Sequence, residues 1–405
     1  MKQIAFAFLA VALLSACSSN GVKLVDAKNF ESTIEGKPVA LYTLTSPSGI
    51  TMQVTNFGGH VVSLWVPDRN GNMADVVLGH NSLKEYVDYE GERFIGCVVG
   101  RVANRIANGK FTIDSTTYQV PINNNGQSLH GGLKGLDQVV WNVDSVSSDR
   151  IQLSYVSPHG AEGYPGNLKI TMTYALTADN EFKITYSATT DRPTVVNLSH
   201  HGFFNLKGEC GGTINDHILT ICADSITPVD SLLIPTGKLM AVAGTPFDFN
   251  QPTAIGKRIN DDHLQLHYGN GYDHNWVLRR NAPGVQLAAT VYEPSSGRLM
   301  EIFTDQPGIQ FYGGNFFNGE GKGKCGNTFK YREAIALETQ KWPDAPNQPA
   351  FPSIRLNPGE KYHQTCIYKF STKYPPPPIS HQTTQPFPNK HIQMCLFGNQ
   401  RTTHR

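Results

Sequence analysis

The sequence predicts an all-β fold, arranged as one large sandwich of extended antiparallel sheets. Apolar and polar residues alternate with a period of two in segments such as 118–120, 169–174 and 181–186, which is the pattern of half-buried strands. No long segment has the apolar spacing of an amphipathic helix, and 38 glycines and 25 prolines interrupt the chain throughout. These observations favour short strands joined by turns.

The first residues have the composition of an export signal. Lys2 precedes a short apolar run, and Ser15 and Ala16 precede Cys17. The run is shorter than the roughly 20 residues needed to cross a bilayer. The cysteine after Leu-Ser-Ala resembles a bacterial lipobox, which predicts a signal peptide over 1–16, lipidation of Cys17, and an exported, membrane-anchored lipoprotein of the periplasm or cell surface. An ordinary cleaved signal with an incidental cysteine is the alternative.

A linker over 17–27 and a single domain over 28–372 are expected to follow. Two domains would be the default at this length, since a large β domain has roughly 200–250 residues, but no linker-like change of composition divides the segment. A hydrophobic content of 39% with 17% charged residues is typical of a globular protein. The formal net charge of +1 gives no basic footprint for nucleic acid.

The remaining cysteines are scattered along the chain and form no Cys-x-x-Cys pair. A zinc ribbon or a disulfide scaffold is therefore not expected, and free thiols buried on strands are the preferred interpretation. They are Cys97, Cys210, Cys222, Cys325, Cys366 and Cys395.

The composition changes at Lys373. Residues 373–405 contain four consecutive prolines and no Asp or Glu, so this tail is predicted to be disordered. A non-native extension from a shifted reading frame is the alternative.

Five ordered polar clusters, each close to glycine or proline, carry the functional signal. They are residues 100–106, 128–132, 197–205, 271–276 and 334–348. Together they resemble the aldose 1-epimerase (mutarotase) family, and the resemblance covers roughly residues 28–371. It implies the large β-sandwich of galactose mutarotase-like proteins and an isomerase of hexose metabolism that interconverts the α and β anomers of free glucose or galactose. It implies no metal or other cofactor.

By this resemblance Glu338 is the catalytic base and His201 the catalytic acid. Mutarotation requires a base for the anomeric hydroxyl and an acid for the ring oxygen, both titrating near neutral pH. Glu338 follows an apolar segment, where a carboxylate needs a partner, so an ion pair with Arg332 or Lys341 is the structural alternative. Trp342 and the loop over 343–348 are expected to form a wall of the sugar site.

His200 and His201 are adjacent on a predicted strand, so their side chains should point to opposite faces. Only one can face a ligand, and the family motif aligns with His201. Gly202 and Phe203 stand where the family often has a hydroxyl residue and a Tyr or Trp, which puts the sugar preference in question more than the reaction.

The resemblance also assigns the contacts to the sugar hydroxyls. An Arg fork and an Asn amide can make paired hydrogen bonds to neighbouring hydroxyls. Taken alone, the histidine could be a surface residue, the aspartate an Asx-turn residue and the glutamine a cross-strand partner. For Arg101, a surface or structural salt bridge is the alternative to a contact with the sugar. The predicted substrate-binding residues are Asn104, Arg105, His130, Asp273 and Gln310.

Two other functions compete with the epimerase. A non-catalytic sugar-binding lipoprotein on the same fold would need hydroxyl contacts but no matched acid and base. An epimerase of phosphorylated hexoses should show clustered Arg and Lys, and an export signal argues against that substrate. The glycine-rich segment 319–324 lacks the spacing of a phosphate loop. The sequence gives no indication of the oligomeric state.

Overall fold

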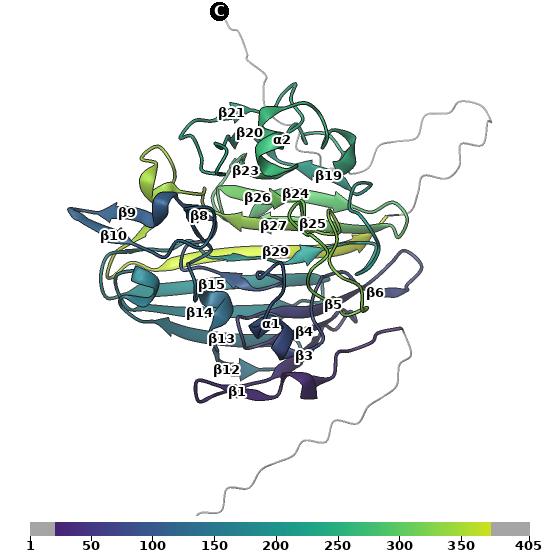
Figure 1. Cartoon of the computed structure of the whole chain (residues 1–405). Coiled ribbons are helices and arrows are strands. Elements are labelled where there is room, and N and C mark those ends of the chain that lie inside the picture. The colour runs from purple at the N-terminus through teal and green to yellow at the C-terminus, as the bar shows by residue number, and fades with distance from the viewer. Residues whose placement is uncertain (1–20, 374–405) are drawn as a thin grey trace, which may run out of the picture.

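The computed structural model describes residues 21–373, and β-strands dominate it (Figure 1). The predicted signal peptide, Cys17, Cys395 and the tail from residue 374 lie outside the described residues. The predicted domain boundaries at 28 and 372 stay predictions.

The largest sheet has nine strands, all paired antiparallel. Side chains of its long central strands alternate between buried and half-buried, because one face packs on the main hydrophobic core. Two of the predicted strands, 169–174 and 181–186, fall inside it and are confirmed. In spatial order the strands are β12 (Asn142–Val146), β13 (Arg150–Ser157), β14 (Leu168–Leu176), β15 (Glu181–Thr190), β29 (Tyr362–Thr372), β25 (Arg298–Thr304), β24 (Gln286–Tyr292), β19 (Ile218–Ile221) and β22 (Thr253–Ala254).

A six-stranded and a four-stranded antiparallel sheet complete the body of the molecule. The six-stranded sheet consists of β18 (Phe203–Phe204), β27 (Ile335–Gln340), β26 (Gly308–Tyr312), β23 (Asp273–Leu278), β20 (Ala223–Thr227) and β21 (Met240–Ala241). The four-stranded sheet consists of β3 (Leu41–Thr45), β4 (Thr51–Thr55), β5 (Val61–Pro67) and β6 (Met73–Asp75).

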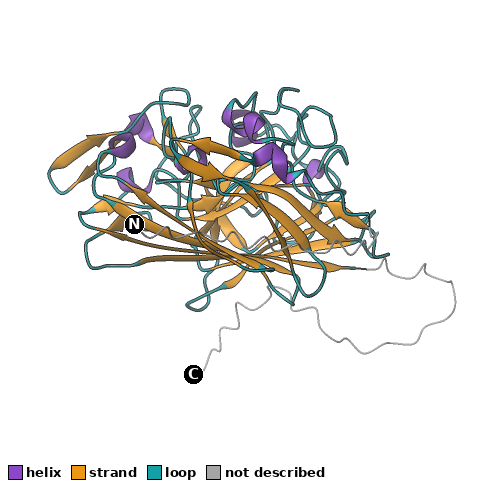
Figure 2. Cartoon of the chain, turned by 90° about the horizontal axis from the view of Figure 1, so that it is seen from below, coloured by secondary structure: helices purple, strands orange, loops and turns teal. Residues whose placement is uncertain are grey.

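The remaining elements are short. The paired strands are β1 (Ser32–Ile34) with β2 (Lys37–Val39), β9 (Lys110–Ile113) with β10 (Thr116–Gln119), β8 (Arg105–Ile106) with β11 (Ser128–Leu129), β16 (Thr194–Val195) with β28 (Arg355–Leu356), and β7 (Val98–Val99) with β17 (Ser199–His200). The helices are α1 (Leu83–Val87), α2 (Leu264–Gly269) and the 3-10 turns η1 (Ala27–Phe30), η2 (Ala107–Gly109), η3 (Leu136–Gln138), η4 (Ala161–Gly163), η5 (Ile255–Lys257) and η6 (Ala345–Asn347). Figure 2 shows the helices and many long loops gathered on one side of the strands.

The central strands of the six-stranded sheet are buried on both faces. On β27, alternation sends Ile335 and Leu337 into the main core, so Glu338 must point to the opposite face. Glu338 is the fourth of the six residues of this strand, so it lies within the strand and not in the loop that follows. The buried strand therefore holds a carboxylate on a rigid support.

The cysteine prediction is partly wrong. Cys97, Cys222 and Cys366 are buried free thiols, as expected, but Cys210 and Cys325 form a disulfide. Their separation of 115 residues shows why local spacing gave no sign of the pairing: the fold brings two distant loops together.

Candidate active site

A pocket of about 500 Å³ opens at the face of the six-stranded sheet to which Glu338 points. Segments from all along the chain line it, including five of the predicted site residues besides Glu338. These are Asn104, Arg105, His130, His201 and Asp273. Gln310 is not part of the lining. The fold therefore brings the sequence motifs together in space, although they lie far apart along the chain.

The pairing of the neighbouring strands β23, β26 and β27 determines where the acidic residues of the pocket lie. Gln310 on β26 lies directly opposite Glu338 on β27 and opposite Asn275 on β23. Asp273 pairs with Tyr312. Because paired residues share a face of the sheet, Asp273, Gln310, Tyr312 and Glu338 all belong to the same side.

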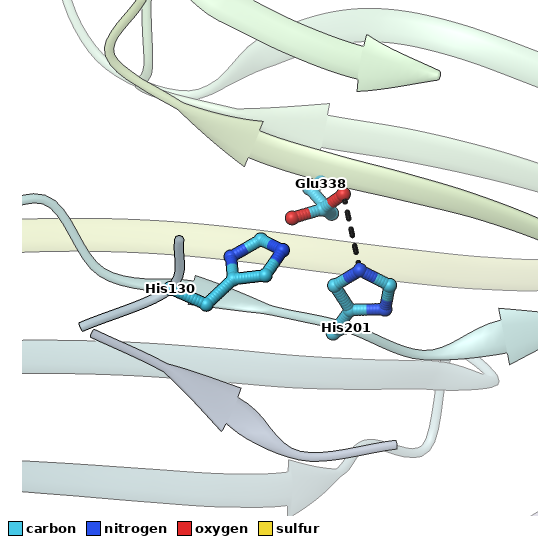
Figure 3. A group of neighbouring side chains, drawn as sticks. All are labelled: His130, His201 and Glu338. Atoms are coloured by element: carbon cyan, nitrogen blue, oxygen red, sulfur yellow. Dashed lines mark ion pairs between the residues drawn. The ribbon is translucent and has the colours of Figure 1, made fainter. Parts of the chain in front are cut away.

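His201 directly follows β17 and lies in the short connection to β18. Its backbone N–H donates to Cys97 O at 2.8 Å, and its carbonyl accepts from Gly96 N–H at 2.9 Å. Its ring lies in the pocket, with Nε2 3.5 Å from Glu338 Oε1 (Figure 3). His200 points the other way, into an aromatic core against Tyr174 and Phe182. The predicted division of the two histidines is confirmed.

His130 stands in a turn beside the first cluster. Its backbone N–H donates to Asn104 O at 3.0 Å, and its Nδ1 accepts from Asn104 N–H at 3.1 Å. The accepting Nδ1 fixes the neutral tautomer, with the proton on Nε2. The ring is perpendicular to that of His201 at 5.1 Å between centroids, and Phe94 packs on it at 4.6 Å. His130 can therefore donate a hydrogen bond to a ligand.

Arg105 and Asp273 form the other polar part of the pocket. The guanidinium Nη1 lies 4.0 Å from Asp273 Oδ2, while its Nε donates to Asn124 Oδ1 at 3.2 Å. Gln310 Nε2 donates to Asp273 Oδ1 at 2.7 Å. The cross-strand alternative for Gln310 is thus the observed one, and its role toward a ligand would pass through Asp273.

Burial shifts the pKa of Glu338 and the pKa values of the two pocket histidines in opposite directions. It raises the pKa of Glu338 well above its usual value, with further contributions from the charges of Asp273 and Glu92. It lowers the pKa of His201 to about 3 and that of His130 well below its usual value. Glu338 is only 2% exposed, and its Oε2 has no hydrogen-bond partner among the described residues. A buried, unpaired carboxylate oxygen facing a pocket is suited to receive a ligand proton.

The ion-pair alternative for Glu338 is not observed. Arg332 donates to Asn260, and Lys341 donates to the carbonyl of Ser353. Arg101 is buried and donates to Ser157 Oγ at 2.7 Å and to carbonyl oxygens, so it is structural, but through hydrogen bonds rather than a salt bridge.

The expected role of Trp342 and the loop that follows is wrong. Trp342 does not line the pocket; it packs against Phe351 and donates to Pro307 O at 3.1 Å. The loop supports the site from behind instead, since Asp344 N–H donates to Arg105 O at 2.9 Å. The aromatic residues that line the pocket are Tyr89, Phe94, Tyr312 and Phe316.

His130, His201 and Glu338 also form a set whose potential ligand atoms lie within 4.8 Å of one another. A metal would need a lone pair on His130 Nε2, yet the hydrogen bond accepted by Nδ1 places a proton there. The three groups therefore suit hydrogen bonding to a polyhydroxylated ligand better than metal coordination.

The sequence motifs did not indicate several lining residues, above all Glu92, Phe94 and Tyr312. Glu92 and Phe94 precede the first cluster in a segment without a recognisable motif. For Tyr312 the signal was its position two residues after Gln310, on the same face of a strand.

A family model described as aldose 1-epimerase matches residues 40–369. Galactose mutarotase of Sus scrofa is 46% identical over 322 residues, which cover 80% of this chain and 91% of the relative. The human galactose mutarotase is 44% identical over the same extent, and the aldose 1-epimerase of Escherichia coli K12 is 35% identical over 83% of this chain and 96% of its own.

Solved structures agree with the sequence matches. A GalM/aldose epimerase homologue from C. elegans superposes with a TM-score of 0.77 at 32% identity, over 82% of this chain and 99% of its own. Galactose 1-epimerase from Lactobacillus acidophilus gives a TM-score of 0.74 at 30% identity, over 85% and 98%.

The predicted localisation is contradicted by these comparisons. The relatives at 44–46% identity are galactose mutarotases of mammals, not bacterial lipoproteins, so the exported, lipid-anchored protein inferred from the first residues is wrong. Among residues 21–373, no helix has the length and apolar character needed to cross a membrane. The lipobox resemblance rested on a few residues, and short motifs of this kind arise by chance.

Proposed function

The chain belongs to the aldose 1-epimerase family, and from that premise we propose that Glu338 and His201 are the acid–base pair with which it interconverts aldose anomers. The protein is a mutarotase, an isomerase of carbohydrate metabolism. The observation that carries the assignment of residues is the 3.5 Å distance between Glu338 Oε1 and His201 Nε2 inside one pocket.

In the ring-opening direction, Glu338 takes the proton of the anomeric hydroxyl while His201 gives a proton to the ring oxygen. The bond between C1 and the ring oxygen breaks, and a free aldehyde forms at C1. After rotation about the bond between C1 and C2, the two groups return their protons and the ring closes on the other face of C1. Both oxygens are bonded to the same carbon, so the acid and the base must lie side by side, as they do here.

The remaining polar residues hold the sugar in place. Arg105, His130 and Asn104 offer hydrogen-bond donors, and Asp273 is a strong acceptor. Gln310 fixes the carboxylate of Asp273 at 2.7 Å and acts as a positioning residue. Since the relatives are named galactose mutarotases, we infer that galactose and glucose are the substrates.

The sugar-binding alternative is not favoured. A binder needs contacts to hydroxyls, whereas a buried carboxylate with an unpaired oxygen beside a buried histidine is costly to fold. That cost is understandable where the two groups exchange protons with the ligand.

The assignment is tested with the variants Glu338→Gln and His201→Asn. Each should lower kcat by at least about 10²-fold, as is typical of a lost acid or base, and should change KM much less. Polarimetry with fresh α-galactose gives both constants, and the rise in Tm with added galactose reports binding independently. The matched control His267→Asn replaces an exposed histidine on α2 and should keep wild-type rates. Near-native turnover by either pocket variant would refute its assignment.

A further inference from the structure

Glu92 lines the pocket but has no part in the proposed mechanism. Its carboxylate accepts from the backbone N–H of Phe94 at 3.0 Å and also from that of Arg93. A carboxylate has about four acceptor sites, so it can still accept a hydrogen bond from a ligand. Burial raises its pKa, and the charge of Asp273 adds to the shift. Glu92 and Asp273 line the same pocket.

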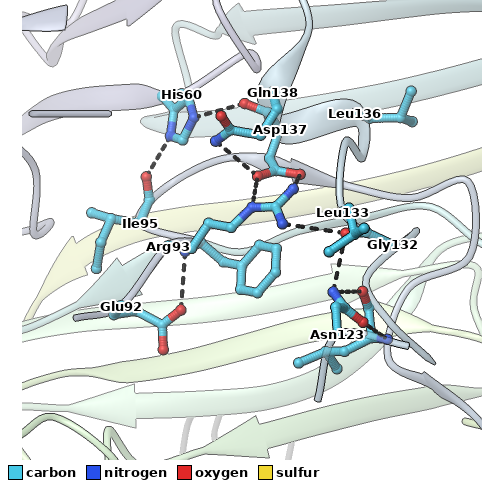
Figure 4. Close-up of polar contacts among 12 residues, drawn as sticks. His60, Glu92, Arg93, Ile95, Asn123, Gly132, Leu133, Leu136, Asp137 and Gln138 are labelled. Carbon is cyan, nitrogen blue, oxygen red and sulfur yellow. Dashed lines mark hydrogen bonds and ion pairs between the residues drawn. The ribbon is translucent and has the colours of Figure 1, made fainter. Parts of the chain in front are cut away.

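The neighbouring Arg93 forms no ion pair with Glu92, because its guanidinium is bound to Asp137 (Figure 4). Its Nε and Nη2 donate to the two carboxylate oxygens of Asp137 at 2.6 and 2.9 Å, and its Nη1 donates to Gly132 O at 3.2 Å. Asp137 is fully buried, and a bidentate pair of this kind is geometrically specific.

The same network fixes the segment that carries Glu92. His60 bridges it to η3, with Nδ1 2.7 Å from Ile95 O and Nε2 3.2 Å from Asp137 O. Gly132 lies two residues after His130, so Arg93 also ties this segment to the turn that carries the His130 ring. Glu92 is thus presented on a braced support rather than on a freely moving loop.

The charges that line the pocket do not balance. The acids are Glu92, Asp273, Glu320 and Glu338, and the cations are Arg93 and Arg105. Arg93 is bound to Asp137, and Arg105 lies beside Asp273. Glu338 lies 3.5 Å from His201 and shares a proton with it, so Glu92 and Glu320 are the carboxylates left without a cationic partner among the lining residues. A cation on the ligand would compensate this charge.

Building on the proposed function, we propose that Glu92 is a specificity-determining residue that lets the enzyme accept cationic aldoses, the amino sugars, and exclude anionic ones, the uronates and sugar phosphates. An ammonium group forms a charge-assisted hydrogen bond with a carboxylate. A carboxylate or phosphate on the sugar would instead meet uncompensated charges of its own sign at a site of reduced dielectric constant.

The test compares kcat/KM for galactosamine, galactose and galacturonate by polarimetry at about pH 7. Glu92→Gln should lower the ratio of galactosamine to galactose by about fivefold to tenfold, the size of one charge pair near a surface, and should raise the ratio of galacturonate to galactose. Glu92→Asp, which keeps the charge, should retain most of the preference. Glu90→Gln removes an exposed carboxylate that does not line the pocket and should leave all ratios unchanged.

Unchanged ratios in Glu92→Gln would overturn the proposal. Should that variant fail to fold, the wild type decides: raising the pH to about 9 deprotonates the sugar amine, while a carboxylate stays charged. The ratio of galactosamine to galactose must then fall, and a constant ratio would overturn the proposal. Absence of galactose turnover in the wild type would refute the proposed function itself, so the two failures can be distinguished.

Discussion

At the scale of single residues, the buried side chains of Glu338 and His201 share one proton. A carboxyl with a raised pKa and an imidazole with a pKa of about 3 together bind one proton over a wide range of pH. Glu338 Oε1 and His201 Nε2 lie 3.5 Å apart, so the proton can reside on either group. The working form, with a carboxylate and an imidazolium, then needs a redistribution of that proton and none from solvent.

The pH dependence of kcat/KM follows from these directions. The pair gains a second proton only as the pH falls toward the lowered pKa of His201, and loses its single proton as the pH rises through the raised pKa of Glu338. We therefore expect no acid limb near pH 6.5, where an unperturbed histidine titrates, and a decline on the alkaline side. Stopped-flow polarimetry from about pH 5 to 9, with circular dichroism to confirm folding, measures the profile. An acid limb centred close to the ordinary histidine pKa would contradict the account.

The sequence motifs predicted the residues with distinctive neighbours. His201 and Glu338 were assigned roles through the resemblance of their motifs to the aldose 1-epimerase family, and local pattern added only that His200 and His201 point to opposite faces and that Glu338 follows an apolar segment. Trp342 was misplaced because its side chain packs behind the site, and no local pattern reveals that orientation. The sequence did not indicate Glu92, because its proposed role depends on its carboxylate having no ion-pair partner. Arg93, its neighbour in the chain, binds Asp137 instead, and only the folded structure shows this.

At the scale of elements, the pairing of β23, β26 and β27 fixes the acidic wall. Alternation along each strand was readable from the sequence, but the register that sets Gln310 opposite Glu338 was not, because these two residues lie 28 positions apart in the chain and meet only in the folded sheet. The loops are less predictable still. The disulfide between Cys210 and Cys325 links two of them over 115 residues.

The turn between β24 and β25 gives a test of stability at this scale. Glu293 accepts from the N–H groups of Ser295 and Ser296 at 2.9 and 2.6 Å. Burial alone would raise its pKa, but the hydrogen bonds from the two serines outweigh burial and lower the pKa to about 2. This stabilisation is complete above the ordinary carboxyl pKa and is lost as the pH falls toward about 2.

We expect Glu293→Gln to lower the free energy of unfolding by about 1–3 kcal/mol at neutral pH, the range for hydrogen bonds to a charged group. Urea unfolding at about pH 7 and again at about pH 3 measures the difference, which should shrink at the lower pH. Glu301→Gln, on β25 of the same hairpin, serves as the control carboxylate. An equal loss at both pH values would show that the charge of Glu293 is not the cause.

At the scale of the whole molecule, three sheets enclose one main core, and the helices and long loops gather on one side of the strands (Figure 2). The all-β class followed from periodicity, since it needs only local alternation. How the sheets pack depends on contacts between distant segments, and here the resemblance to a family supplied what periodicity could not. The localisation predicted from the first residues was wrong, because it rested on a few residues with no support from the rest of the chain.

The central claim is that this sandwich is a working mutarotase and not only a sugar-binding protein. Polarimetry of fresh α-galactose and α-glucose with purified wild-type protein tests this most directly, with Glu338→Gln as the matched protein blank. We expect the wild type to bring both sugars to the same final rotation as buffer alone, at a rate that increases in proportion to enzyme concentration. Relaxation no faster than in buffer, by protein that is folded and binds the sugar, would contradict the account.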